Sequence, residues 1–174
     1  IHRPFILAVG TIEPRKNLEF LIGVFERLSS FEGELIFVGP FGWNYEGISR
    51  KKDQSPRSNS IRFLSFASEA DLPALYSAAE ILAFPSQYEG FGFPGLEAMA
   101  CGTRVVASDI QCFREVFGPA ATLLPLSDDE AWKCGLQELL EPSEVYTDRV
   151  VMGLEHAKGF CWDKAADQTW NVYQ

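Results

Sequence analysis

Short, uninterrupted apolar runs alternate with longer amphipathic segments, and this pattern most constrains the fold. Residues 5–9 are consecutively apolar and end at Gly10, and residues 35–38 repeat the pattern before Gly39. A continuous apolar run is typical of a strand buried on both faces, as in parallel sheets covered by helices. Between these two runs, apolar residues from Leu18 to Leu28 recur at helical spacing and predict an amphipathic helix.

The same alternation continues along the chain. Further strands are predicted at residues 61–64, 81–84, 104–108 and 122–124, and helices at 69–79, at 94–101 and over most of the chain from 128 onward, with breaks at 142–143 and 159. Residues 40–60 are predicted as a long loop with one short helix. The chain is therefore expected to be an α/β protein with a doubly wound, Rossmann-like parallel sheet of about six strands, with helices on both faces. With 174 residues and no internal repeat or linker, residues 1–174 are expected to form a single domain.

Charge and composition exclude several classes of function. The chain has 24 acidic and 15 basic residues, a net charge of −9, so an extended basic surface for nucleic acid is excluded while a local anion pocket is not. No apolar stretch approaches the roughly 20 residues of a membrane span, and no signal segment opens the chain. The four cysteines have no metal-ligand spacing and are predicted to be reduced core thiols of a cytoplasmic protein. With two histidines and no HExxH or GxSxG motif, zinc and Ser-His hydrolase chemistry have little support.

Ligands of doubly wound sheets bind beyond the carboxyl ends of the strands, and three segments at such ends could carry chemistry. In the first, residues 10–17, a flexible Gly10 is followed by Arg15 and Lys16 beside a helix start, which favours anions. The alternative is an exposed basic turn in which Asn17 caps the helix. In the third, Leu64 to Leu72, Ser68 is placed to cap a helix, and Phe66 either covers a flat ligand or packs in the core.

The second segment, residues 88–97, follows the predicted strand at 81–84. Gly90 and Gly92 allow the backbone to turn its amides toward a ligand, and Pro94 suits the first position of a helix. These amides would form a concave anion-binding nest, flanked by Glu89 on the loop and by Glu97 in the first helical turn. The plainer alternatives are a solvated loop acid for Glu89 and a helix-dipole partner for Glu97.

These residues resemble a known family. The segment EGFGFPGLEAMACGTRVVAS, with Glu89 and Glu97 separated by seven residues, is similar to the signature of the group 1 glycosyltransferases, family 4 of that class. The upstream segments VGTIEPRKNLEFLI and RFLSFASEADLPALYSAAEILAFPS resemble the same family in the same order, and FCWDKAADQTWNVY resembles its closing helix, at about 162–174.

The resemblance implies the carboxy-terminal, donor-binding half of a GT-B enzyme that transfers a hexose from a nucleotide sugar, with retention of configuration and without a metal or other cofactor. The acceptor, a glycan or lipid-linked sugar, would be bound mainly by an N-terminal domain outside this chain. A role in polysaccharide biosynthesis follows, in the cytoplasm or peripheral to the inner face of the membrane. The isolated domain is expected to be inactive.

The resemblance also assigns roles to residues. Glu97 would bind the ribose hydroxyls, Glu89 the donor sugar, Lys16 the diphosphate, and the backbone near Leu64 the base. The expected catalytic residues are Glu89, Lys16 and Arg15; the expected donor-binding residues are Gly10, Thr11, Leu64, Ser65, Phe66, Gly90, Phe91, Gly92, Phe93 and Glu97.

The chain departs from the family pattern at two positions. Many members have arginine where this chain has Thr11, so Arg15 is a candidate to supply that charge, and many have glycine where Ser65 stands. Two alternatives of other kinds stay open: a non-catalytic nucleotide-sugar-binding module, and a sugar-nucleotide epimerase or phosphorylase on the same architecture.

Overall fold

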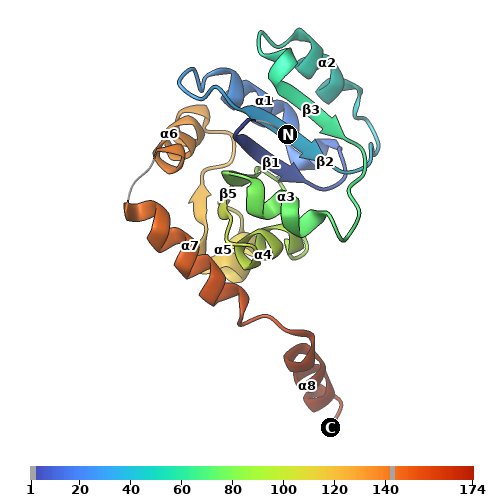
Figure 1. Ribbon diagram of the computed structural model, residues 1–174. Helices are drawn as coiled ribbons and strands as arrows, with labels where there is room; N and C mark the ends of the chain where they lie inside the picture. Colours follow the sequence, from blue (N-terminus) through green and yellow to red (C-terminus); the bar gives the residue numbers. More distant parts are fainter. Residues whose placement is uncertain (1–2, 142–143) are drawn as a thin grey trace.

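A six-stranded parallel sheet forms the centre of the protein. The structure, a computed structural model, describes residues 3–141 and 144–174 (Figure 1). The strands lie in the order β3-β2-β1-β4-β5-β6, and every pair of neighbours is parallel. Their bounds are β1 (Phe5–Val9), β2 (Glu34–Val38), β3 (Ile61–Leu64), β4 (Ile81–Phe84), β5 (Arg104–Ser108) and β6 (Thr122–Leu124). The predicted fold class and strand positions are confirmed.

Helices cover both faces of the sheet. On one face, Ile6 and Ala8 of β1 pack in a core with α1 (Leu18–Glu26), α2 (Glu46–Gln54) and α6 (Asp129–Leu140). On the other face, Phe5 and Leu7 pack with α3 (Leu72–Ala78), α4 (Phe93–Ala100) and α5 (Gln111–Phe117). Consecutive residues of β1 thus enter opposite cores, which explains why the strand is apolar at every position.

The remaining helices lie outside these layers. α7 (Glu144–Ala157) packs against α4, and α8 (Trp162–Val172) extends away from the sheet at the end of the chain (Figure 1). Short 3-10 turns occupy Pro14–Lys16 (η1), Ser58–Ser60 (η2) and Gly118–Ala120 (η3). No helix among the described residues is long and apolar enough to span a bilayer.

The segment 40–60 contains one short helix, α2, as predicted, together with the 3-10 turn η2. Other local predictions were wrong in detail. The helix predicted at 69–79 begins later, at Leu72, because residues 68–71 form a turn in which the Ser68 hydroxyl accepts a hydrogen bond from the Asp71 amide at 3.2 Å. The four cysteines are free as predicted, yet Cys134 and Cys161 are exposed and not in the core. The predicted break at 142–143 falls on residues outside the described part of the chain.

Candidate functional site

The strand order reverses between β1 and β4. From β1 the chain moves to β2 and β3 on one side, and from β4 to β5 and β6 on the other, so the crossovers leave opposite faces at this point. The first loop (residues 10–17) follows β1, and the second loop (residues 85–92) follows β4. The Gln87 amide donates to the Arg15 carbonyl at 2.8 Å, which joins the two loops at the carboxyl edge of the sheet. This is the position at which doubly wound sheets bind ligands.

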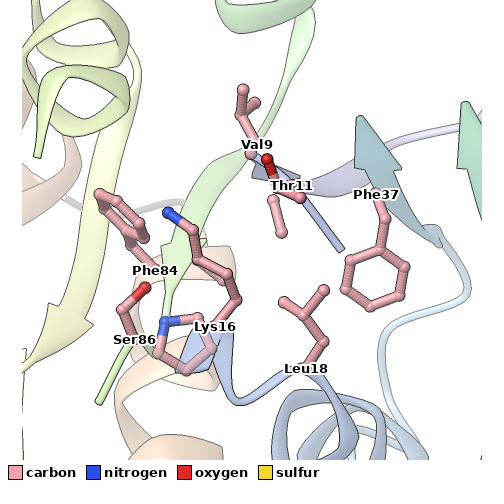
Figure 2. A pocket seen from close by; sticks show the side chains of 11 residues that line it. Val9, Thr11, Lys16, Leu18, Phe37, Phe84 and Ser86 are labelled. Carbon is pink, nitrogen blue, oxygen red and sulfur yellow. The ribbon is translucent and has the colours of Figure 1, made fainter. Parts of the chain in front are cut away.

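Lys16 lies almost fully buried between the two loops. Its side chain is 9% exposed, and its ammonium lies 5.0 Å from the centroid of the Phe84 ring (Figure 2). Gly10 has φ +133°, and a Cβ there would lie 3.1 Å from Lys16 Nζ. The glycine is therefore required both by its backbone conformation and by the space that the lysine occupies.

Glu89 is held by three donors from both loops. Lys16 Nζ lies 2.5 Å from its Oε1 and the Ser86 hydroxyl donates to the same oxygen at 2.8 Å, while Arg15 reaches Oε2 at 3.0 Å. Burial of Glu89 raises its pKa, but the hydrogen bond and charge of Lys16, with the bonds from Ser86 and Arg15, outweigh burial and hold the pKa of this carboxyl below its ordinary value. Glu89 is therefore a fixed carboxylate at neutral pH.

Arg15 connects three parts of the site. Besides Glu89 Oε2, its guanidinium contacts the Glu13 carboxylate through Nε and donates to the Tyr88 carbonyl at 3.1 Å. Glu13 is itself buried. The side chain of Arg15 thus bridges a carboxylate of its own loop to the second loop.

The backbone after Glu89 turns toward α4. Gly92 has φ +105°, and a Cβ there would lie 2.9 Å from the rings of both Phe113 and Phe117. Within the described residues, the amides of Gly90, Phe91 and Gly92 donate to no backbone carbonyl or side chain. They precede the N-terminus of α4, so the turn carries unpaired donors of the kind that favours an anion.

Glu97 lies one residue further along α4 than expected. The helix begins at Phe93, so Glu97 is its fifth residue and not part of the first turn, because the helix starts one residue before Pro94. The Tyr76 hydroxyl donates to Glu97 Oε2 at 2.7 Å. Burial, followed by the hydrogen bond and charge of Glu97, raises the pKa of Tyr76, so the phenol stays a donor at neutral pH. The Glu97 carboxylate is exposed but has a fixed orientation.

The predicted base-binding segment follows β3, two strands away from β1. With neighbouring strands about 5 Å apart, it lies on the order of 10 Å from the first loop along the same edge. The Leu64 carbonyl accepts from Gly39, and Ser65 is exposed. Phe66 is 81% exposed, which excludes the core role that sequence left open for it.

The pocket at the switch point is small. It is lined by residues of the first loop, including Gly10, Thr11 and Lys16, and by Phe84 and Ser86 on the β4 side, as Figure 2 shows. Its volume of about 10 Å³ is the space of one water molecule. A ligand larger than a phosphate oxygen therefore lies over this pocket and across the strand ends.

The structure brings together Gly10, Thr11, Arg15, Lys16 and Glu89, with the amides of 90–92 following directly. Glu97 and residues 64–66 lie apart from this cluster: in the described part of the chain, none of them bonds to Lys16, Arg15 or Glu89. No three His, Cys, Asp or Glu side chains of the described residues are grouped to hold a metal ion.

Sequence reasoning missed three side chains that position the predicted ones: Ser86, Glu13 and Tyr76. Ser86 lies two residues beyond β4, so its place at a strand end was a signal that could have found it. Glu13 lies inside the first loop, but its pairing with Arg15 was not deducible from spacing. Tyr76 comes from α3, and nothing in the local sequence links it to Glu97.

The fold and the site together define an α/β domain of the Rossmann-like class, with a cluster of paired charges (Arg15 and Lys16 with Glu13 and Glu89) at the switch point of the sheet. The sequence profile of the glycosyl transferases group 1 family matches residues 2–150. The chain belongs to this family, and its fold is that of one half of a GT-B glycosyltransferase.

Relatives and solved structures agree with this placement. The chain is 35% identical over 173 residues to an O-antigen chain mannosyltransferase B of Escherichia coli, covering 98% of this chain and 45% of the relative. It is 32% identical over 170 residues to a D-inositol 3-phosphate glycosyltransferase of Mycobacteroides abscessus, covering 95% of this chain and 38% of that protein. A sucrose-phosphate synthase structure from Thermosynechococcus elongatus superposes with a TM-score of 0.89 at 28% identity, covering 99% and 45% of the two chains. The chain therefore spans less than half the length of these proteins.

Proposed function

We propose that this chain is the donor-binding half of a retaining glycosyltransferase that transfers a hexose from a nucleoside-diphosphate sugar to a glycan or lipid-linked acceptor. One observation carries the proposal: the switch point of a group 1 family sheet holds a buried lysine against a charged carboxylate, beside a turn of unpaired amides. Among hexoses, mannose is favoured, since a relative 35% identical to this chain is a mannosyltransferase.

In this proposal, Lys16 and the amide turn bind the diphosphate. Departure of the leaving group builds negative charge on the phosphates, and the Lys16 ammonium, once it contacts the diphosphate, stabilises that charge together with the amides of the turn. Gly10 is part of this arrangement because it leaves space for Lys16 Nζ. The lysine cation and the amide dipoles stabilise the negative charge on the leaving diphosphate, which a metal ion would otherwise do, so the reaction as proposed needs no metal.

Glu89 would hold the hydroxyls of the donor sugar. Its carboxylate is ionised and lies beside Lys16, so a diphosphate bound to the lysine brings the attached sugar to the carboxylate. Positive charge develops on the sugar as the leaving group departs, and a nearby carboxylate stabilises it. In this role Glu89 orients the sugar and forms no covalent bond.

Glu97 would bind the ribose, with Tyr76 keeping its carboxylate in orientation, and the backbone at residues 64–66 would contact the base. The helix contacts support this assignment, because α3 follows β3 and α4 follows β4, so the bond from Tyr76 to Glu97 joins the helices that follow the strands expected to bind the base and the diphosphate. Phe66 is exposed at the end of this edge, where an aromatic ring can cover the base.

A second domain is expected to bind the acceptor and close the site. The pocket has room for about one water molecule, too little to enclose a sugar nucleotide, so a facing wall is needed to exclude water during transfer. α8 carries an exposed stripe of apolar side chains that suits contact with such a domain: Trp162, Ala165, Ala166, Trp170 and Tyr173. We expect a cytoplasmic enzyme, or one peripheral to the inner membrane face, and no transfer by this chain alone.

Calorimetry with nucleoside, nucleoside diphosphate and sugar nucleotide tests the assigned roles. Glu97→Ala is expected to weaken binding of all three by about 1.5–3 kcal/mol, the value of a hydrogen bond to a charged group. Lys16→Ala should weaken the diphosphate more than the nucleoside, with a loss that shrinks as salt rises. Glu89→Ala should leave the diphosphate nearly unchanged and weaken the sugar nucleotide. Lys158→Ala, at an exposed pair with Glu155 just after the end of α7, is the control. If Glu89→Ala and Glu97→Ala reduced the affinity for the nucleoside diphosphate equally, this division of roles between the two glutamates would be refuted.

The reaction itself is tested on the full-length protein. Proton NMR of the fresh product reports the anomeric configuration, and retention is expected. Binding without transfer to any acceptor would favour a non-catalytic module, and epimerised nucleotide sugar would identify an epimerase. Release of sugar phosphate by inorganic phosphate would identify a phosphorylase.

A further inference from the structure

The Arg15 guanidinium is directed at carboxylates and a carbonyl, and its arrangement differs from that of Lys16. Lys16 is almost fully buried and lines the pocket, whereas the side chain of Arg15 is 39% exposed and does not line it. The guanidinium of Arg15 contacts Glu13, Glu89 and the Tyr88 carbonyl, all of them acceptors of the protein itself. A diphosphate would have to compete with two carboxylates for this guanidinium.

The two oxygens of Glu89 have different partners. Oε1 accepts from Lys16 and Ser86, and Oε2 is bound by Arg15 at 3.0 Å. When Lys16 turns to a phosphate, Oε1 of Glu89 loses its ion pair with the lysine. The ion pair of Oε2 with Arg15 then remains. Glu13 fixes the other edge of the guanidinium, so the three side chains form a carboxylate–guanidinium–carboxylate bridge between the two loops.

From this geometry we infer that Arg15, oriented by Glu13, is a positioning residue that holds Glu89 toward the donor sugar after Lys16 has moved to the diphosphate, and is not itself a diphosphate ligand. The inference rests on the proposed function. It changes the role expected for Arg15 from sequence, where it was a candidate replacement for the arginine that many family members have at the position of Thr11. It also adds Glu13 to the residues on which the reaction depends.

Binding of GDP and GDP-mannose, and of UDP and UDP-glucose, separates the two roles of Arg15. For the pair that binds more tightly, Arg15→Met should change the Kd of the diphosphate less than about twofold. The affinity for the sugar nucleotide, measured relative to that for the diphosphate, should fall about tenfold or more, as expected for the loss of a hydrogen bond to a charged group. Glu13→Gln should show the same pattern more weakly. If Arg15→Met instead weakens the diphosphate as strongly as Lys16→Met does, Arg15 is a phosphate ligand and the inference is wrong.

The conservative variant gives a second, independent readout. Arg15→Lys keeps the charge but has no planar fork, so it cannot bridge two carboxylates and should restore little of the lost affinity for the sugar nucleotide. If Arg15 were a phosphate ligand, Arg15→Lys would instead retain most of the binding affinity, because lysine also binds phosphate. In the full-length protein, kcat for transfer should fall about tenfold or more in Arg15→Lys, with the diphosphate product inhibiting as in the wild type.

A double-variant cycle distinguishes positioning from a general loss of structure. Arg15 acts through Glu89. Adding Arg15→Met to Glu89→Gln should therefore raise the Kd of the sugar nucleotide by less than about a further twofold. Additive losses would overturn the inference. If no nucleotide binds, or if Lys16→Met has no effect on the diphosphate, the proposed function fails first, and that outcome differs from every outcome that concerns Arg15.

Discussion

Replacing Lys16 with methionine tests how strongly the switch point is held together by charge. Methionine has a similar length but removes the ammonium, and with it the cation that lies 5.0 Å from the centroid of the Phe84 ring. Glu89 then retains Ser86 and Arg15 as partners and loses the bond of 2.5 Å at Oε1. The change therefore removes one of two cations from a carboxylate that is 10% exposed.

The expected loss of stability lies between two limits. Breaking a fully buried ion pair costs about 3–5 kcal/mol, because the remaining charge is stranded. An exposed pair contributes about 0–1 kcal/mol. Since Arg15 still compensates Glu89, we expect Lys16→Met to lower the free energy of unfolding by about 1.5–3 kcal/mol at pH 7, the value of one charged hydrogen bond.

The loss should depend on pH in a defined direction. The pKa of Glu89 is lowered in the folded protein, so its stabilising contribution is present above its unfolded value and is lost as pH falls through the folded value. Without Lys16, the hydrogen bond and charge that lower the pKa of Glu89 most are lost, so this pKa rises relative to that of the wild type. The difference in the free energy of unfolding between wild type and Lys16→Met should therefore be largest near pH 7. It should shrink as the solution is acidified below the ordinary pKa of a glutamate.

Urea unfolding followed by circular dichroism measures this difference, with the m-value checked for constancy. Lys158→Met is the matched control, because Lys158 pairs with Glu155 at 2.6 Å while both side chains are about two-thirds exposed. It should cost less than about 0.5 kcal/mol. Equal losses for the two variants, or a coupling near zero in the cycle of Lys16→Met with Glu89→Gln, would refute the reasoning.

Three further predictions concern the end of α1 and the surroundings of the site. Arg57→Met should lower the free energy of unfolding by about 2–3 kcal/mol in urea, because the guanidinium caps the carbonyls at the end of α1, among them those of Phe25 at 2.8 Å and Leu28 at 2.9 Å. Gly92→Ala should destabilise by about 1–3 kcal/mol, since its φ is positive and the Cβ meets two phenylalanine rings; Gly90→Ala, with open space around it, should cost much less on the same denaturant curve. Tyr76→Phe should weaken nucleoside binding up to about tenfold in calorimetry by releasing Glu97, and an unchanged Kd would separate this tyrosine from the site.

The sequence determined the sheet and most of the site through local patterns. Each strand was marked by an apolar run, because both faces of the sheet are buried. The polar residues of the interior strands stand at strand ends, as Glu34 does in β2 and as Arg104 and Ser108 do in β5. The turn glycines were equally visible. Gly10 and Gly92 have positive φ, a conformation that selects glycine whatever surrounds it. Lys16 and Glu89 were found because chemistry in such a fold follows the ends of strands.

The tertiary structure alone decided which of these side chains meet. Lys16 and Glu89 are 73 residues apart, and their contact depends on β1 and β4 lying side by side in the sheet, an order that apolar runs do not encode. The same adjacency bonds Arg15 to Glu89, and packing of α3 beside α4 brings Tyr76 to Glu97. Local patterns report the secondary structure and backbone conformation of each residue. Partners distant in the chain are set by strand order and helix packing, because these bring separate segments within the few ångströms over which hydrogen bonds and ion pairs act.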